Sequence, residues 1–593
     1  MVISMIDLLK KVISIFQYKE PVTKEGGFEL LEDFNDNYHK YDYSNPQDKK
    51  QNESIPRKNV TKEIKPLHVG GWNKEKKLEK KSESSERLYD NSENVSKILQ
   101  LNMEHLRKKL NISVNQDITI REFNIAQKTA AFIVFINGMV DKTTINQSVL
   151  AQLMNPDCFT NFKGCSIVDF VMKNVISIHG VSKTQKLQQV ATQVLNGATA
   201  LFIDNCEDCL LLESKGYEKR NISPPRTETV IKGSQEGFTE DLDTSLTLIR
   251  RIIRNEQLVS EIIPVGQTNK INCAILYLKG IANPRLIKEI KRRISKIDID
   301  YLLGDGMLEQ LIEDNPFMLF PQCINTERPD RAASFIAEGH VVVISDGTPF
   351  ALAVPVTFFT LVHTSEETML RWQYGTFIRL VRYAGIFLAV FLPGLYVSLS
   401  QFHHEMIPTP LLATIISTKE NVPFPIILEV LLMELSFELM REGGIRIPGI
   451  IGQTLGIVGA LILGQAAVAA GLVSPILIII VAVTGIGSFV VPNYSLALGL
   501  RITRFIFLLF GAVMGFYGIA VGLTILGAMA CSMKSFGVPF LSPVSPKTKS
   551  GSDTIIRYPL WMQRYRPDYL NTPARSRSTG DPRKWKRARD DTK

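Results

Sequence analysis

One apolar stretch carries polar side chains at a spacing that suits a water-filled path. It reads IPGIIGQTLGIVGALILGQAAVAAGLV and contains Gln453, Thr454 and Gln465. Thr454 and Gln465 are eleven residues apart, which is about 20° of net rotation on a helix of 3.6 residues per turn. Val458 and Leu461 fall on the stripe between them. Such a helix could line a pore that holds water at its polar ends and closes by dewetting at its apolar middle. Ordinary packing, with Gln and Thr bonded to neighbouring helices, explains the same pattern.

The apolar segment 423–442 contains ionisable side chains, which membrane helices rarely carry. Its sequence, PFPIILEVLLMELSFELMRE, is interrupted by Glu429, Glu434, Glu438 and Arg441. The last three share one face of a helix, because they are spaced i, i+4 and i+7. Ionisable groups are costly in lipid, so this face must contact protein, water or headgroups. The segment fits either a packed helix with internal ion pairs or a helix whose acids attract cations.

Signatures of enzymes and metal sites are sparse. Cys206 and Cys209 form a lone CxxC pair, without a second ligand pair at matching spacing. His403 and His404 precede Glu405, but adjacent residues of a helix point apart and no third ligand is evident. The sequence contains no nucleophile elbow and no kinase motif set. We therefore expect a protein that is not an enzyme and that has no catalytic residue, cofactor or metal ligand.

The elements that position these residues divide by composition. Residues 1–110 carry 21 Lys and Arg and 18 Asp and Glu, whereas residues 447–500 carry none of these four types. This contrast excludes both a single soluble domain and a fully disordered chain of 593 residues. We expect residues 1–114 to form a disordered charged extension. Residues 536–593 should form a basic cytosolic tail that meets anionic lipid and binds no nucleic acid.

Residues 115–375 intermix strand and helix patterns, which indicates a cytosolic mixed α/β region. We expect two subdomains, residues 115–240 and 241–375. Asp346-Gly347 is a strong hairpin signal, Thr239 is a possible N-cap, and Pro284 stands at the start of a helix. The pattern predicts helices over 142–155, 165–177, 240–258 and 284–297, and strands or hairpins over 129–140, 198–214, 271–278 and 340–354.

Residues 376–535 are expected to form a polytopic helical membrane domain. The apolar spans are 383–404, 423–442, two within 447–500 separated by a turn at 471–475, and 505–533. Five single crossings would leave the basic tail outside, whereas the arginines at the ends of the spans place it inside. We expect the glycine-rich segment 505–533 to bend back and restore even parity. Segment 423–442 lying flat would restore parity as well, but it would place Arg501 and Arg504 outside.

Several strings in order along residues 125–545 resemble the A subunit of the GerA-type spore germination receptor family. They are GSQEGF from Gly233, TERPD from Thr326, DGTPF from Asp346, LPGLY from Leu392, EMIPT from Glu405, REGG from Arg441, GIVG from Gly456 with GQAAV from Gly464, and SFGVP from Ser535. The order makes the set specific, although each string alone is weak.

The resemblance implies a location in the inner membrane of the dormant spore, with both terminal regions cytosolic. Such A subunits assemble with a transporter-like, nutrient-binding B subunit and a lipoprotein C subunit. Amino acids, sugars or nucleosides trigger germination, and the A subunit is thought to oligomerise into a ligand-gated cation channel. The family's cytosolic domain is built of two α/β-type subdomains.

We therefore expect a nutrient-gated cation channel subunit. Val458 and Leu461 would form the constriction, with Thr454 and Gln465 holding water on either side. The glutamates of segment 423–442 would concentrate cations near a mouth. A motif in the cytosolic region would couple the two regions through an ion-pair cluster of its charged members; it consists of Thr326, Glu327, Arg328, Pro329 and Asp330. The alternatives are a secondary transporter and a scaffold that recruits germination proteins without conducting ions.

Overall fold

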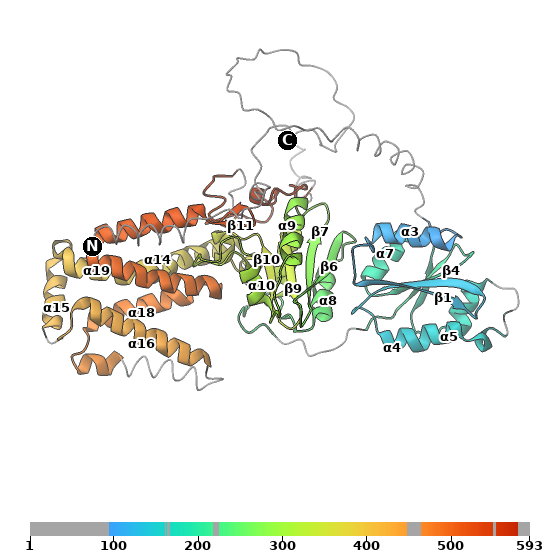
Figure 1. The fold of residues 1–593 in the computed structure, drawn as a ribbon, viewed down its shortest axis with the longest axis horizontal. Coiled ribbons are helices and arrows are strands. Elements are labelled where there is room, and N and C mark those ends of the chain that lie inside the picture. Colours follow the sequence, from blue (N-terminus) through green and yellow to red (C-terminus); the bar gives the residue numbers. More distant parts are fainter. Residues whose placement is uncertain are drawn as a thin grey trace, which may run out of the picture.

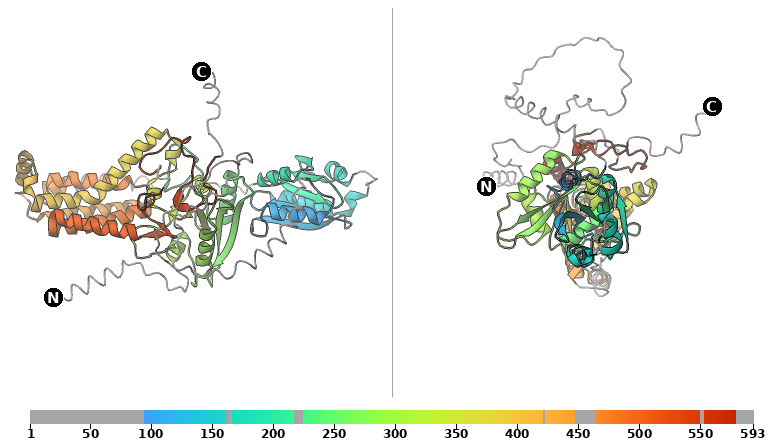
Figure 2. Two further views of the ribbon diagram at one scale, coloured as in Figure 1. Left: turned by 90° about the horizontal axis from the view of Figure 1, so that it is seen from above. Right: turned by 90° about the vertical axis from the view of Figure 1, so that its right-hand side faces the viewer.

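The chain folds into two sheet-containing units and a bundle of long helices. The computed structural model describes residues 94–160, 162, 166–216, 224–420, 422–446, 464–548 and 553–578. The three parts follow one another along the longest axis (Figure 1), and the view from above shows the same order (Figure 2). The expected mixed α/β region followed by a helical region is confirmed.

The first unit is a five-stranded sheet with helices on both faces. Its strands lie in the order β1-β2-β4-β5-β3, and every neighbouring pair is antiparallel. The central strand β4 is buried along its whole length, which suits its apolar sequence TALFI. The strands are β1 (Ile118–Ile125), β2 (Thr129–Ile136), β3 (Val181–Thr184), β4 (Thr199–Ile203) and β5 (Cys209–Leu212).

Two hydrophobic cores cover the two faces of this sheet. We expected order to begin at residue 115, but α3 buries Leu106 and Leu110 against the first sheet, so this unit begins earlier. Segment 1–93 lies outside the described residues. The helices are α3 (Leu99–Lys109), α4 (Lys142–Thr144), η2 (Ile145–Leu150), α5 (Ala151–Met154), η3 (Pro156–Phe159), α6 (Ile167–Phe170), η4 (Val171–Val175) and α7 (Leu187–Leu195).

The second unit repeats the plan with a sheet in the order β6-β7-β9-β10-β8. Its neighbouring strands are again antiparallel. The elements are α8 (Leu242–Ile252), β6 (Leu258–Val265), β7 (Ile271–Leu278), α9 (Pro284–Ser295), α10 (Asp305–Ile312), β8 (Ile324–Thr326), α11 (Pro329–Glu338), β9 (Val341–Ser345) and β10 (Ala351–Val354).

Local signals in the second unit gave mixed results. The hairpin at Asp346-Gly347 is confirmed, since β9 pairs with β10 and Gly347 has a φ of 87°. Pro284 begins α9, as expected. The expected N-cap Thr239 is wrong: the side chain of Asp241 caps α8 by accepting from the amide of Thr244 at 2.9 Å. Asp241 is the better cap because its negative carboxylate also interacts favourably with the positive N-terminal end of the helix dipole.

A buried ion pair joins the two units. Arg250 on α8 binds Asp117, which immediately precedes β1, and both side chains are nearly inaccessible. Ser260 on β6 donates to the same carboxylate at 2.8 Å. The side chain of Asn115 accepts from the amide of Ser260 at 2.8 Å. These contacts are far apart in sequence, so they fix the first unit against the second.

Among its described residues, the helical region contains two helices that are long and apolar enough to cross a membrane, α14 and α19. Helix α18 is apolar but shorter. Residues 464–469 are also helical. The elements are α12 (Phe358–Val362), α13 (Glu366–Met369), α14 (Trp372–Phe402), η5 (His404–Met406), α15 (Thr409–Lys419), α16 (Ile426–Arg446), α18 (Pro475–Phe489) and α19 (Tyr494–Ser532).

Helix α19 reverses direction at Gly515. This glycine has φ 59° and ψ −141°, a conformation that only glycine adopts readily. A Cβ atom built on Gly518 would lie 2.1 Å from the carbonyl oxygen of Phe510, eight residues earlier. Residues that far apart are about 12 Å distant along a straight helix. The expected bend in segment 505–533 is therefore confirmed: α19 is two antiparallel legs.

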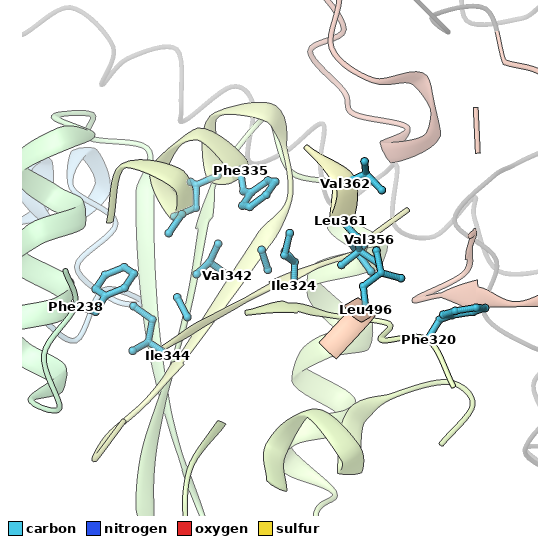
Figure 3. Close-up of a cluster of buried hydrophobic side chains, with 14 of the residues drawn as sticks. Phe238, Phe320, Ile324, Phe335, Val342, Ile344, Val356, Leu361, Val362 and Leu496 are labelled. Atoms are coloured by element: carbon cyan, nitrogen blue, oxygen red, sulfur yellow. The ribbon is translucent and has the colours of Figure 1, made fainter. Parts of the chain in front are cut away.

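The core of the second unit continues into the helical region. One cluster of buried side chains contains Phe335 from α11, Ile344 from β9, Leu361 from α12 and Leu496 from α19. Figure 3 shows these elements converging, with Leu496 beside Val356 and Leu361. Because one apolar core is shared, the start of α19 moves with the second unit.

The chain after α19 returns to the second unit. The hydroxyl of Ser535 donates to the carbonyl of Gln322 at 2.6 Å, and Arg566 Nε donates to the carbonyl of Ala337 at 3.0 Å. The expected basic tail therefore has a described part, 553–578, that lies on folded protein. The last short elements are β11 (Lys534–Ser535), β12 (Val538–Pro539) and η6 (Asp568–Leu570).

Candidate functional site

The motif at 326–330 is built around a buried arginine. The side chain of Arg328 is 1% exposed, and it binds Asp330 through two parallel hydrogen bonds of 3.1 and 2.7 Å. It also donates to the carbonyls of Glu228 at 3.3 Å and Ser234 at 2.9 Å. The planar guanidinium suits this bidentate arrangement, which a lysine cannot reproduce. Pro329 begins α11 at a position where its missing amide proton costs nothing.

Glu327 and Thr326 bind the segment that connects the two units. Glu327 Oε2 accepts from the amides of Arg226 and Thr227 at 2.7 and 3.0 Å. The hydroxyl of Thr326 donates to Glu228 at 2.8 Å. We expected an ion-pair cluster of Glu327, Arg328 and Asp330; the arginine and aspartate form such a pair, whereas Glu327 binds backbone amides. The motif therefore clamps the connecting segment to the second sheet.

A second charged network surrounds the start of α14. Glu367 on α13 is 1% exposed and binds Arg379 at 2.6 Å as well as Arg382. Arg379 also binds Asp553 of the C-terminal segment at 2.8 Å. Three parts of the chain, α13, α14 and the tail, thus share one buried ionic cluster.

Charge states in this cluster follow from its geometry. Burial alone would raise the pKa of Glu367, but nearby His363, Arg379 and Arg382 hold it below its usual value. Burial, followed by the charge of Arg379, lowers the pKa of His363 to about 4. At neutral pH Glu367 is therefore ionised and His363 is neutral.

Arg557 fastens the tail to the same place. Its guanidinium donates to the carbonyls of Leu370 at 2.8 Å and Thr368 at 3.1 Å. Gly375 on α14 leaves room for the arginine, because a Cβ atom there would lie 2.8 Å from Arg557 Cδ. The contact satisfies backbone carbonyls at the C-terminal end of α13, which have no partner within that helix.

The acids of α16 contact arginines of α19. Arg504 Nη2 lies 3.1 Å from Glu434 and 2.6 Å from Glu438, and the side chains of Arg504 and Glu434 are each 1% exposed. Arg501 lies 3.9 Å from Glu438, and Arg441 lies 3.1 Å from it. The pair between Glu438 and Arg441 is internal to segment 423–442, as in the first of our two interpretations, whereas the other pairs join it to α19. Helix α16 is thereby fixed to the first leg of α19.

Arg441 also reaches α18. It donates to the hydroxyl of Ser488 at 2.8 Å and lies over the rings of Phe437 and Phe489 at 4.8 and 4.7 Å. Such cation–π contacts are stronger where water is excluded. The ionic cluster therefore joins three helices of the bundle.

Glu429 lies apart from this cluster. Its carboxylate accepts from the amide of Ser474, just before α18, at 3.3 Å. It is 3% exposed. The acid consequently stabilises the turn that precedes α18, and it lies about two and a half helical turns before Glu438 on α16.

The stripe of segment 447–470 is described only at one end. Thr454, Val458 and Leu461 lie outside the described residues. Gln465 lies in the helical residues 464–469 and is exposed, whereas Ala467 beside it is buried against α16 and α18. The amide of Gln465 therefore points away from the described bundle.

Sequence reasoning missed the partners that complete these clusters. It used Arg501 and Arg504 only to orient the spans, and it gave Arg379 and Arg382 no role. The usable signal was their position at the ends of apolar segments, where a charge must find a partner or reach headgroups. Glu367 gave no signal, because it stands in an ordinary polar stretch.

Comparison with known proteins gives the family. The family model described as "Bacillus/Clostridium GerA spore germination protein" matches residues 104–569 of this chain. The chain belongs to the GerA family of spore germination proteins. It is 37% identical to spore germination protein KA of Bacillus subtilis over 492 residues, covering 82% of this chain and 90% of that protein. It is 38% identical to spore germination protein GerLA of Bacillus cereus, covering 77% and 92%.

A solved structure is similar over part of this GerA family chain. It is the N-terminal domain of the A subunit of the Bacillus megaterium spore germinant receptor GerK3, with 30% identity and a TM-score of 0.36. The match covers 45% of this chain and 97% of that domain.

Proposed function

We propose that this GerA family chain is a subunit of a nutrient germinant receptor and that several copies form a nutrient-gated cation channel in the spore inner membrane. The observation that carries the proposal is the polar–apolar–apolar–polar stripe of segment 447–470. Its described member, Gln465, is exposed on the bundle. Ordinary packing between helices of one copy would bury that amide, so its exposure favours a face that meets water or other copies.

The bundle supports a polytopic arrangement. Helix α14, helix α16, helix α18 and the two legs of α19 would provide five crossings. Segment 447–470, expected from its composition to span, would be the sixth. An even number returns the chain after Ser532 to the side of the second unit, where Ser535 binds Gln322. The arginines at the ends of the helices then lie on the cytosolic side, in agreement with the positive-inside rule.

The acids divide between two roles in this proposal. Glu434 and Glu438 are paired with arginines, so they hold helices together more readily than they collect cations at a mouth. Glu429 lies toward the other end of α16, where an acid near the turn before Ser474 adds negative potential. We assign any cation attraction to Glu429.

Gating requires two arrangements of the bundle that nutrient favours differently. Nutrient would bind mainly on the B-type partner, and the C-type lipoprotein would complete the complex. The second unit shares its core with Leu496 of α19 and with Val390 of α14. A rotation of that unit would therefore move both helices and tilt the pore face. Thr326 to Asp330 would keep the first unit's connection rigid during this motion.

Ion flux through the reconstituted complex tests the proposal. Val458→Ala and Leu461→Ala should conduct ions without nutrient, because a wider and less apolar constriction stays wet. Ile479→Ala on α18 is the matched control, since Ile479 is 63% exposed and apolar. Its flux should remain dependent on nutrient. If both pore variants stay closed without nutrient and spores that carry them germinate normally, the chain would instead act as a scaffold. In that case, substitution of Glu327 should abolish assembly of the complex.

A further inference from the structure

Three side chains that suit a metal ion meet beside α10. Glu309 lies on α10, Glu313 follows its last turn, and Cys323 precedes β8. One potential ligand atom from each lies within 4.8 Å of the other two. The two glutamates are four residues apart, so they project from the same face. The second unit thus brings two carboxylates and a thiol to one point.

No positive charge within the described residues neutralises the two carboxylates. The partners of the carboxylates are the side-chain amide of Asn325, which donates to Glu309 at 3.0 Å, and the backbone amide of Gln322, which donates to Glu313 at 3.3 Å. Arg293, which donates to the carbonyl of Ile312 beside Glu313, forms its ion pairs with Glu289 and Asp314. The two partly buried carboxylates therefore have no ion-pair partner among the described residues, and a cation would supply one.

The thiol provides a second and independent feature. Cys323 is 1% exposed, and it faces both carboxylates instead of solvent. The Oδ1 atom of Asn325, whose amide group touches Glu309, is buried without a hydrogen-bond partner. A sulfur and an oxygen atom with free electron pairs therefore adjoin the acids.

We propose that Glu309, Glu313 and Cys323 bind one divalent transition-metal ion, for which Zn²⁺ is the best match. Zinc accepts thiolate at about 2.3 Å and carboxylate at about 2.0–2.2 Å, whereas Mg²⁺ and Ca²⁺ prefer oxygen alone. Tetrahedral binding needs ligand atoms roughly 3.5 Å apart, which side-chain rotation can reach from the observed spacing. Asn325 Oδ1 or water takes the fourth position. The thiol releases its proton when the metal–sulfur bond forms.

The site lies at the junction between the second unit and the end of the helical region. Gln322, the neighbour of Cys323, accepts through its carbonyl from Ser535, which follows α19. A bound ion would tie α10 to the residues that hold this contact. Metal occupancy would therefore stabilise the attachment of the return leg of α19.

Cobalt binding to the purified full chain in lipid nanodiscs tests the site, because a thiolate bound to Co²⁺ gives a charge-transfer absorption. We expect about one equivalent per chain, displaced by Zn²⁺. Cys323→Ser should abolish the absorption, and Glu309→Gln should weaken Co²⁺ binding by at least about tenfold. Cys273→Ser is the matched control, since Cys273 is equally buried on β7 and is not part of the cluster.

Elemental analysis after Zn²⁺ loading provides a measurement that does not depend on the thiol. Glu309→Gln and Glu313→Gln should each retain less zinc than the parent chain while keeping its circular dichroism spectrum. The proposal is overturned if the parent chain binds no Co²⁺ or Zn²⁺, or if Cys323→Ser and Cys273→Ser bind alike. The acids would then be neutralised by protons.

Discussion

Substitution of Gly518 tests the reversal of α19 directly. A Cβ atom at this position would lie 2.1 Å from the carbonyl oxygen of Phe510 and 2.8 Å from its carbon. Ordinary carbon–oxygen contacts are longer by about 1 Å, so the two legs must separate. Overpacking of this kind costs about 1–3 kcal/mol. Gly518→Ala should therefore lower the melting temperature of the purified chain by about 2–12 °C.

Gly527→Ala is the matched control on the return leg, because a Cβ atom there meets nothing within 4 Å. It should leave stability within about 0.5 kcal/mol of the parent chain. Spin labels on Ile502→Cys and native Cys531 measure the reversal itself, once other reactive cysteines are replaced. A straight helix would hold these positions about 44 Å apart, whereas two packed legs should hold them below about 25 Å. Equal stability of the two alanine variants, or the longer distance, would refute the reasoning.

Three other substitutions follow from the ionic clusters and buried histidines. Arg328→Ala should destabilise the second unit by about 3–5 kcal/mol, because it leaves Asp330 half-buried without its cation; Arg328→Lys should recover only part of this in thermal unfolding. Glu434→Ala should cost less than this, because Arg504 keeps Glu438 as a partner at 2.6 Å, and the loss is measured as earlier melting in detergent. Burial lowers the pKa of His340 from 6.5 to about 4. Between pH 6.5 and 4, the imidazole of His340 is protonated in the unfolded chain but neutral in the folded one. The contribution of His340 to stability therefore falls as the pH drops from 6.5 toward 4. The stability difference between parent and His340→Gln should change in that window by about 1.4 kcal/mol per pH unit, and a pH-independent difference would contradict the assignment.

The periodic parts of the fold were predictable from sequence. The turn residues Asp346-Gly347 and the apolar runs 271–278 and 340–354 located strands β7, β9 and β10, and the glycines of segment 505–533 indicated the bend. Strands β6 and β8 were missed, and the helix expected over 240–258 ends at Ile252, before β6 begins. The predicted start of the first unit was wrong because α3 is rich in charged residues, and its sequence therefore resembles a solvent-exposed extension. Only its burial of Leu106 and Leu110 against a distant sheet makes it part of the fold. Tertiary packing overrides local composition in such cases.

The candidate site was predictable in part. Spacing alone placed Glu434, Glu438 and Arg441 on one face, and the structure gives that face its partners on α19. The role of Glu327 was not predictable, since its ligands are the backbone amides of residues about a hundred positions earlier. Backbone donors carry no residue-type signal. The proximity of Glu309 and Cys323 was not predictable either, because the loop between α10 and β8 brings them together and its path is not evident from the sequence.

Fastening of the tail to the start of α14 has a consequence for biosynthesis. Asp553 and Arg557 complete the surroundings of Arg379 and Leu370, yet they leave the ribosome more than 170 residues later. Helix α14, which is long and apolar enough to cross a membrane, is therefore synthesised before the contacts that anchor its base. A truncated chain that ends before Asp553 would keep the contacts of Arg379 and Arg382 with Glu367 but lose those of the tail.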